Sequence, residues 1–293
     1  MNAAHRQEVD VLEWLITPLG YTFMQRGLLA SLIVGVVCAV FGCYVVLRGM
    51  AFLGDALAHA ILPGIAIAYL LQGNLTLGAL VAAIVVALLI GLFSRQGAIR
   101  EDTAIGILFA AALSLGVALI SSIRTYAVDL SHILFGNVLG ISSSDLWLAG
   151  GLGVLVLASV FLLYKPFLVI SFDPVLAATL RWRAELLRNL LLILLALTIV
   201  ISLQTVGVGL VASMLVTPAA TAYLLTRRLP AMMLLSALLG AFSSLTGLYL
   251  SYYVNIASGA AVVLTATACF LLAFLFAPGR GMIWQWLNRK PAK

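Results

Sequence analysis

Charged residues are scarce in this sequence. Of its 293 residues only 9% are Asp, Glu, Lys or Arg, whereas 64% are hydrophobic. A soluble domain carries about 25% charged residues, so this chain has too little polar surface to cover a water-soluble fold. We therefore expect an all-α integral membrane protein, with lipid as the solvent for most of its surface.

Several sequence motifs are also missing. The chain has no GxxxxGK[ST] sequence with which to cradle the phosphates of ATP, and no HExxH motif of a zinc protease. Gly54-Asp55 is not part of a GxGD sequence, which disfavours an intramembrane aspartic protease. The basic residues, which give a net charge of +6, occur singly or in pairs and form no stripe. Nucleic-acid binding is therefore not expected.

What the sequence does contain is long apolar runs. Runs of roughly 20 residues predict about nine transmembrane helices, with eight as the alternative count. Residues 1–22 are expected to form an N-terminal interfacial segment, and the shorter run 133–141 a re-entrant or interfacial piece. The predicted spans lie near 23–47, 51–72, 75–94, 103–123, 144–164, 185–204, 207–226, 231–252 and 258–278.

The basic residues predict an orientation. If loop 95–102 is cytoplasmic, all of the 16 lysines and arginines except Arg6, Arg26 and Arg124 lie on the cytoplasmic side. This asymmetry follows the positive-inside rule, and it predicts an outside N-terminus and a cytoplasmic tail, residues 281–293.

Two ionisable residues lie inside the second predicted span, AFLGDALAHAILPGIAIAYLL. Asp55 and His59 are four residues apart, so their side chains share one face of a helix. Ionisable groups at membrane depth are costly and mark solute pathways, although a hydrogen-bonded pair that only joins two helices is the alternative. A carboxylate and a neutral imidazole at this spacing can reach one divalent transition metal ion. Two ligands are too few for a tight metal site, so a second copy of the chain across a dimer axis is expected to complete it.

Prolines and a second histidine supply further candidates. Pro63 follows His59 within about one turn and predicts a kink beside a pathway. Pro218, in VASMLVTPAATAYLL, is a candidate gate position or an ordinary membrane kink, with Ser213 and Thr217 able to satisfy the freed backbone groups. His132, near the predicted outer face, is either a capture ligand for metal or part of a solvated loop.

Segment 165–184 resembles a cytoplasmic docking element more than a plain linker. Asp173 stands where a helix N-cap belongs, and Pro174 occupies the first helical position. Arg181 then ends a short helix near 173–183, with Val175 and Ala178 as its candidate contact positions.

Several stretches of the sequence strongly resemble the manganese/zinc/iron permease family of ABC transporters, and they follow the family's order. The likeness covers roughly residues 23–280 and is specific for the family but not for the metal. The stretches are VLRGMAFLGDALAHAILPGIAIA, EDTAIGILFA, DLSHILFGNVLG, GLVASMLVTPAATAYLL and SGAAVVLTATACFLLAFLFAP.

The resemblance implies a type II-like importer fold and a role for the matching residues. Asp55 and His59 match the family's intramembrane metal ligands, and FDPVLAATLRW matches its coupling segment, although Arg181 replaces a glycine usual there. The implied partners are a cytoplasmic ATP-binding subunit, an extracytoplasmic metal-binding protein and a second or related permease. The cargo is Mn²⁺, Zn²⁺ or Fe²⁺, manganese first, bound transiently and with no permanent cofactor. The chain itself is expected to be no enzyme, in a bacterial inner membrane.

Two other classes remain as alternatives. In a proton-coupled secondary metal transporter, Asp55 and His59 would relay protons, but an odd number of spans and a long cytoplasmic helix disfavour the inverted repeats common in such proteins. A membrane receptor or scaffold has no use for a buried ionisable pair.

Overall fold

The computed structural model is helical throughout the residues it describes, which are 16–94, 99–122, 140–172, 174–180, 183–278 and 281–287. One short 3₁₀ helix, η1, precedes the α-helices. In chain order the elements are η1 (Thr17–Gly20), α2 (Thr22–Leu47), α3 (Phe52–Ala60), α4 (Leu62–Leu70), α5 (Leu75–Phe93), α6 (Glu101–Ser121), α8 (Ser143–Leu162), α9 (Tyr164–Phe172), α10 (Pro174–Thr179), α11 (Ala184–Val206), α12 (Val208–Leu225), α13 (Leu229–Val254), α14 (Ser258–Phe276) and α15 (Met282–Leu287).

The helices confirm the predicted membrane architecture. Within the described residues, eight helical segments are long and apolar enough to cross a membrane, and α3 and α4 together count as one of them. The predicted span 207–226 corresponds to α12, whose apolar part Leu210–Leu225 is shorter than the other eight. The two predicted counts, nine and eight, therefore differ only in whether this helix is included.

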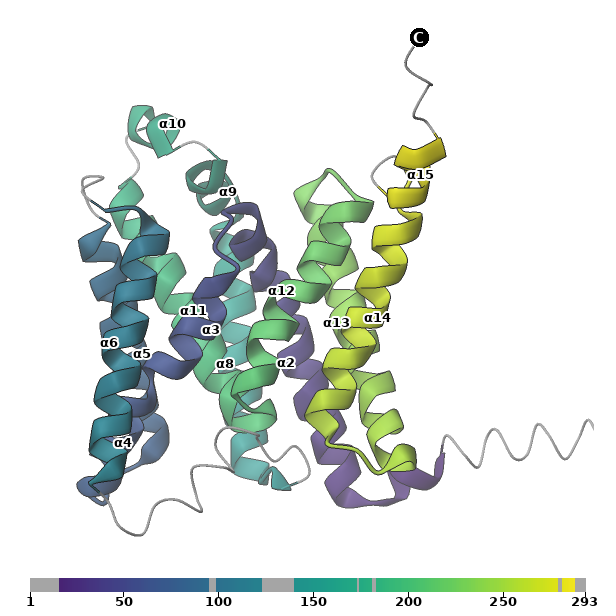
Figure 1. Cartoon of the computed structure of the whole chain (residues 1–293), viewed down its shortest axis with the longest axis horizontal. Coiled ribbons are helices and arrows are strands. Elements are labelled where there is room, and N and C mark those ends of the chain that lie inside the picture. Colours follow the sequence, from purple (N-terminus) through teal and green to yellow (C-terminus); the bar gives the residue numbers. More distant parts are fainter. Residues whose placement is uncertain are drawn as a thin grey trace, which may run out of the picture.

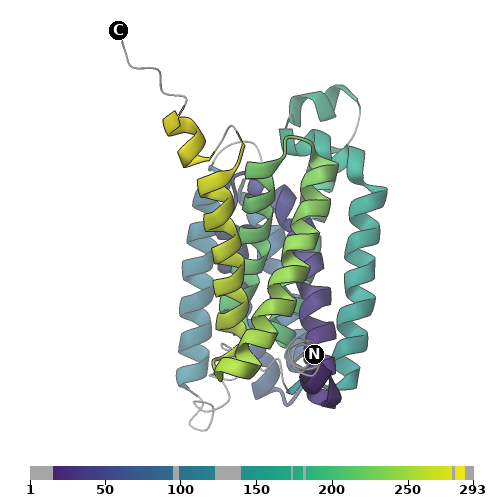
Figure 2. The same cartoon turned by 90° about the vertical axis from the view of Figure 1, so that its right-hand side faces the viewer.

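The membrane-length helices run up and down through one bundle, and the short helices α9, α10 and α15 lie together at one end of it (Figures 1 and 2). We call this end the α10 end. Helix α2 lies inside the bundle, where it packs against α8, α11, α12 and α13. Because α2 has neighbours on all sides, it is the most buried of the eight candidate spans.

Small residues allow the central helices to approach closely. A Cβ atom at Gly42 of α2 would overlap the backbone carbonyl of Leu215 in α12, so only glycine fits there. Hydroxyl groups of α13 add hydrogen bonds to carbonyl oxygens of α2: Ser236 donates to Ala39 at 2.7 Å and Ser244 to Ser31 at 2.9 Å. Close backbone approach and interhelical hydrogen bonds are the usual stabilising contacts between helices in lipid.

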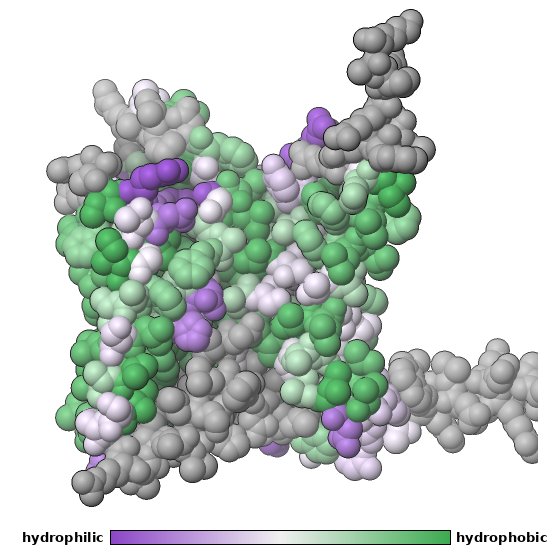
Figure 3. Space-filling view, in the orientation of Figure 1, coloured by the Kyte–Doolittle hydropathy of each residue, from purple (hydrophilic) through white to green (hydrophobic). Residues whose placement is uncertain are grey.

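Large apolar side chains cover the outside of the bundle. Helix α8 exposes Trp147, Val154 and Phe161, which are 82%, 68% and 74% accessible. Figure 3 shows a mostly hydrophobic face with few hydrophilic patches. Such a surface is stable when hydrocarbon surrounds it, which agrees with the membrane assignment.

Candidate metal site

The site begins with the two ionisable side chains of α3. The Nε2 atom of His59 lies 3.6 Å from the Oδ1 atom of Asp55, one helical turn earlier. The side chains are 27% and 39% exposed, respectively, whereas the neighbouring Ala56, Leu57 and Ala58 are buried. The structure therefore confirms the predicted shared face, and it turns that face toward the outside of the bundle.

The helix that carries the pair ends directly after it. Helix α3 ends at Ala60, and α4 begins at Leu62 with Pro63 among its first residues. Proline has no backbone N–H and fixes its own φ, so it fits the first turn of a helix and interrupts a longer one. The predicted continuous span 51–72 is consequently two helices with a break at Ile61. His59 lies in the last turn before this break.

Helix α6 runs beside α3 and α4 and forms the second wall of the site. The ring of Phe109 meets the ring of His59 edge to face, with centroids 6.0 Å apart, and meets Phe52 in the same way at 5.6 Å. Further along, a Cβ at Gly116 would lie 2.8 Å from Leu62. The His59 ring is thus positioned by its own helix and by α6.

The pair lies on α3, which runs from the α10 end toward the middle of the bundle (Figure 1). Figure 3 shows a small hydrophilic patch about halfway along this face. Within the part of the chain that the structure describes, no group of three or more His, Cys, Asp or Glu side chains is placed to hold a metal ion. Two half-exposed ionisable groups at membrane depth require water or another protein surface in front of them.

Helix α12 borders α3 on the other side. A Cβ at Gly54 would lie 3.1 Å from a methyl group of Leu215, so the two helices touch beside Asp55. Pro218 lies inside α12, which continues past it. The hydroxyl groups of Ser213 and Thr217 are 3.3 Å apart and hydrogen-bond to each other; their role in satisfying freed backbone groups stays a prediction.

The remaining sequence candidates are only partly described. His132, Asp173 and Arg181 lie outside the described residues, as do the side chains of Pro174, Val175 and Ala178. The predicted short helix is present as α10, which begins at Pro174. Within α10 the side chain of Leu176 is 46% exposed and that of Ala177 is buried.

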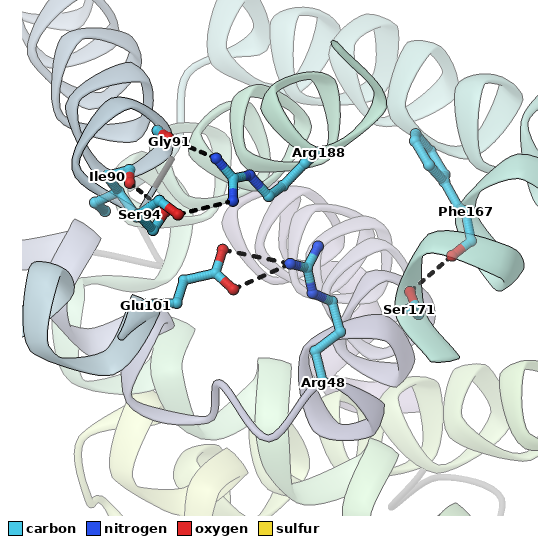
Figure 4. A network of polar contacts seen from close by, with 8 residues as sticks. All are labelled: Arg48, Ile90, Gly91, Ser94, Glu101, Phe167, Ser171 and Arg188. Carbon is cyan, nitrogen blue, oxygen red and sulfur yellow. Dashed lines mark hydrogen bonds and ion pairs between the residues drawn. The ribbon is translucent and has the colours of Figure 1, made fainter. Parts of the chain in front are cut away.

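A polar network at the α10 end was missed by the sequence analysis. The guanidinium of Arg48, at the end of α2, donates from Nη2 to both carboxylate oxygens of Glu101, the first residue of α6, at 3.1 and 3.3 Å. Arg188 of α11 donates to the carbonyl oxygens of Gly91 and Ser94 at the end of α5, at 2.5 and 3.5 Å. Figure 4 shows both arginines from close by.

Fold and site together define a polytopic helical membrane protein with a partly exposed carboxylate–imidazole pair on one of its membrane-spanning segments. Residues 20–277 match the model of the ABC 3 transport family. The chain belongs to this family, and it is a multi-pass permease of the ABC transporter type.

Relatives with known names cover nearly the whole chain. It is 47% identical over 275 residues to the manganese transport system membrane protein MntC of Halalkalibacterium halodurans, covering 94% of each chain. It is 40% identical over 266 residues to a probable iron transport system membrane protein of Haemophilus influenzae, covering 91% of this chain and 98% of the relative. Among solved structures it resembles PsaBC from Streptococcus pneumoniae in complex with Fab, with a TM-score of 0.82 and 38% identity, covering 92% of this chain and 97% of that one.

Proposed function

We propose that this chain is the transmembrane subunit of an ATP-driven importer of a divalent transition metal ion, with manganese as the physiological cargo. The observation that carries the proposal is the Asp55–His59 pair, whose side chains lie 3.6 Å apart and partly exposed on α3. A divalent metal cation suits this pair because the carboxylate supplies negative charge and the neutral imidazole supplies a nitrogen lone pair.

The pair is half of a site. Two side chains leave most coordination positions of a metal ion open, and the partial exposure of both side chains leaves room for ligands from a neighbouring chain. A second copy of the chain, or a related permease, would bring another carboxylate and imidazole to the same ion. A site with few fixed ligands also releases its ion readily, as transport requires.

The named relatives guide the choice of metal. One relative is named for manganese transport and another for probable iron transport. An oxygen-and-nitrogen donor set suits both Mn²⁺ and Fe²⁺, and it usually binds Zn²⁺ more tightly because such sites follow the Irving–Williams order of affinities. We infer that manganese is transported, and that zinc binds the same pair at least as tightly and is carried slowly or inhibits.

The work of transport is divided among several proteins. An extracytoplasmic metal-binding protein delivers the ion, and a separate cytoplasmic subunit hydrolyses ATP. The permease itself makes or breaks no covalent bond. The ATP-binding subunits transmit their movement to the permease through α10, which projects beyond the ends of the long helices (Figure 1).

Reconstitution tests the proposal. The permease, its ATP-binding subunit and the metal-binding protein are placed in liposomes, and ATP-dependent uptake of Mn²⁺, Fe²⁺ and Zn²⁺ is measured. We expect manganese uptake by the wild type, and a loss of at least about a hundredfold in Asp55→Asn and His59→Gln, because each variant removes one of two ligands. Asp102→Asn is the matched control, since Asp102 is an exposed carboxylate at the start of α6. Near-normal uptake by Asp55→Asn would contradict the site assignment.

A competition experiment tests the inference about zinc. Mn²⁺ uptake is measured in the presence of increasing Zn²⁺, and we expect inhibition at zinc concentrations below the half-saturating manganese concentration. Fast zinc turnover without manganese transport would show that the shape of the pocket, and not the donor set, selects the metal.

A further inference from the structure

The polar network at the α10 end joins α11 to the end of α5, and the end of α2 to the start of α6. It contains two arginines from different helices and one carboxylate, and it lies outside the site described above. The inference drawn from it rests on the proposed transport function.

The first half of the network concerns Arg48 and the turn into α3. Gly49 adopts φ +70° after α2, and Met50 N–H donates to the carbonyl of Val45 while Gly49 N–H donates to that of Val46. This pair of hydrogen bonds is the Schellman arrangement that ends a helix in a fixed geometry. Arg48 is therefore attached rigidly to the start of α3, and Asp55 follows within about two turns.

Through Glu101, Arg48 reaches α6, the second wall of the site. The Arg48 side chain is only 10% exposed and that of Glu101 only 24%, so water screens their attraction weakly. Phe109, whose ring contacts His59, lies on the same helix as Glu101, roughly 12 Å further along at 1.5 Å per residue. The ion pair thus fixes α3 against α6 at one end of the metal site.

The second half of the network concerns Arg188. Helix α10 ends at Thr179 and α11 begins at Ala184, so Arg188 lies about one turn into the helix that follows the coupling helix. It holds the last carbonyl groups of α5, and residues 95–100 then lead directly from α5 to Glu101. Arginine near a helix C-terminus satisfies free carbonyl groups and interacts favourably with the helix dipole.

The end of α5 and the start of α6 are consequently each held by an arginine, one from α11 and one from the end of α2 (Figure 4). The network also contains buried polar atoms without a hydrogen-bond partner in the described part of the chain, namely Arg48 Nη1, Arg188 Nε and Asn189 Oδ1. Burying a polar group without a hydrogen-bond partner is unfavourable. These two donors and one acceptor are therefore available for new hydrogen bonds when α11 shifts.

We propose that Arg48, Glu101 and Arg188 are positioning residues that transmit the displacement of α10 and α11 to α3, and thereby open and close the Asp55–His59 site. Arg188 moves the end of α5, α5 moves α6 through their packing contact, and Glu101 at the start of α6 moves Arg48 with the attached start of α3. None of the three touches the metal ion.

The test separates ATP hydrolysis, metal binding and uptake in the reconstituted complex. Glu101→Gln keeps the shape of the side chain and removes its charge. We expect the ratio of metal taken up to ATP hydrolysed to fall about tenfold, as coupling free energies of roughly 1–2 kcal/mol imply. Hydrolysis and equilibrium Mn²⁺ binding stay within about threefold of wild type. The exposed Asp102→Asn is the control and keeps the wild-type ratio.

A charge-reversed pair provides the readout that a merely structural role would not give. Arg48→Glu alone uncouples the transporter, and adding Glu101→Arg restores at least half of the uptake ratio. If Glu101→Gln is not recovered from membranes, Arg188→Lys carries the test, because it keeps the charge and loses the fork that reaches both carbonyl groups; its ratio falls at least threefold.

Unchanged ratios in Glu101→Gln and Arg188→Lys, or hydrolysis and uptake that fall in parallel, would overturn the inference. Failure of the proposed function looks different: the wild type then moves no divalent metal, or Asp55→Asn moves it normally.

Discussion

At the scale of single residues, the contacts between the central helices depend on the absence of side chains. Gly42 lies where α2 meets the backbone of Leu215 in α12, and the space there is smaller than a methyl group. Gly150 of α8, in contrast, has open space in front of its Cβ direction. An added methyl group would therefore clash at Gly42 and fit at Gly150.

The first prediction compares these two glycines. Gly42→Ala must push α2 and α12 apart, so we expect it to destabilise the protein by about 1–3 kcal/mol, as overpacked cores do. Gly150→Ala should be neutral or stabilising by up to about 1 kcal/mol, because alanine is the better helix former. Thermal unfolding of both variants in detergent measures the difference. Equal stabilities would show that α2 and α12 are not in backbone contact.

The residues also show what a sequence can reveal about a site. Asp55 and His59 were predicted because helical periodicity alone places positions four apart on one face. The pair Arg48–Glu101 was not, because its members are 53 positions apart and only the folded chain brings the end of α2 to the start of α6. The one available signal was that each stands at the polar end of an apolar run.

At the scale of elements, hydropathy located the spans because almost no charge interrupts them. It could not place the break at Ile61, although Pro63 predicted a kink nearby, since a proline in the first turn of a new helix and one inside a bent helix look alike in sequence. The gate role of Pro63 and Pro218 stays a prediction. So does the coupling role of α10.

Cysteine crosslinking tests the coupling role of α10. Leu176 is exposed and its neighbour Ala177 is buried, so the helix presents a defined face. We expect Leu176→Cys to crosslink to the ATP-binding subunit in the assembled complex, and Ala177→Cys to crosslink at least about tenfold less, because buried thiols react poorly. Labelling of Leu176→Cys only from outside the cell would contradict both the docking role and the predicted orientation.

At the scale of the whole molecule, the outside of the bundle has two kinds of apolar face. The face of α8 carries exposed large apolar side chains such as Val154, and lipid suits it. The face of α3 and α6 places Phe52, which is half exposed, beside Asp55 and His59. Lipid does not suit this second face, so a protein partner should cover it.

A pair of cysteine variants distinguishes the two faces. If two copies of the chain meet over the metal pair, Phe52→Cys should form a disulfide or a short crosslink between copies on mild oxidation, visible as a dimer on a non-reducing gel. Val154→Cys, on the lipid face, should remain monomeric under the same conditions. Crosslinking through Val154 and not through Phe52 would place the subunit interface elsewhere and leave the metal pair incomplete.

The enclosed position of α2 also has a consequence for biosynthesis. Helix α2 leaves the ribosome before the other described spans, yet its hydrogen-bond partners Ser236 and Ser244 lie about 200 residues later in the chain. During synthesis α2 is therefore exposed to lipid, or to the insertion machinery, until α12 and α13 have been made. Chains that stop before α13 should lack the contacts that enclose α2. We expect membrane quality control to degrade them even though most of their spans are already inserted.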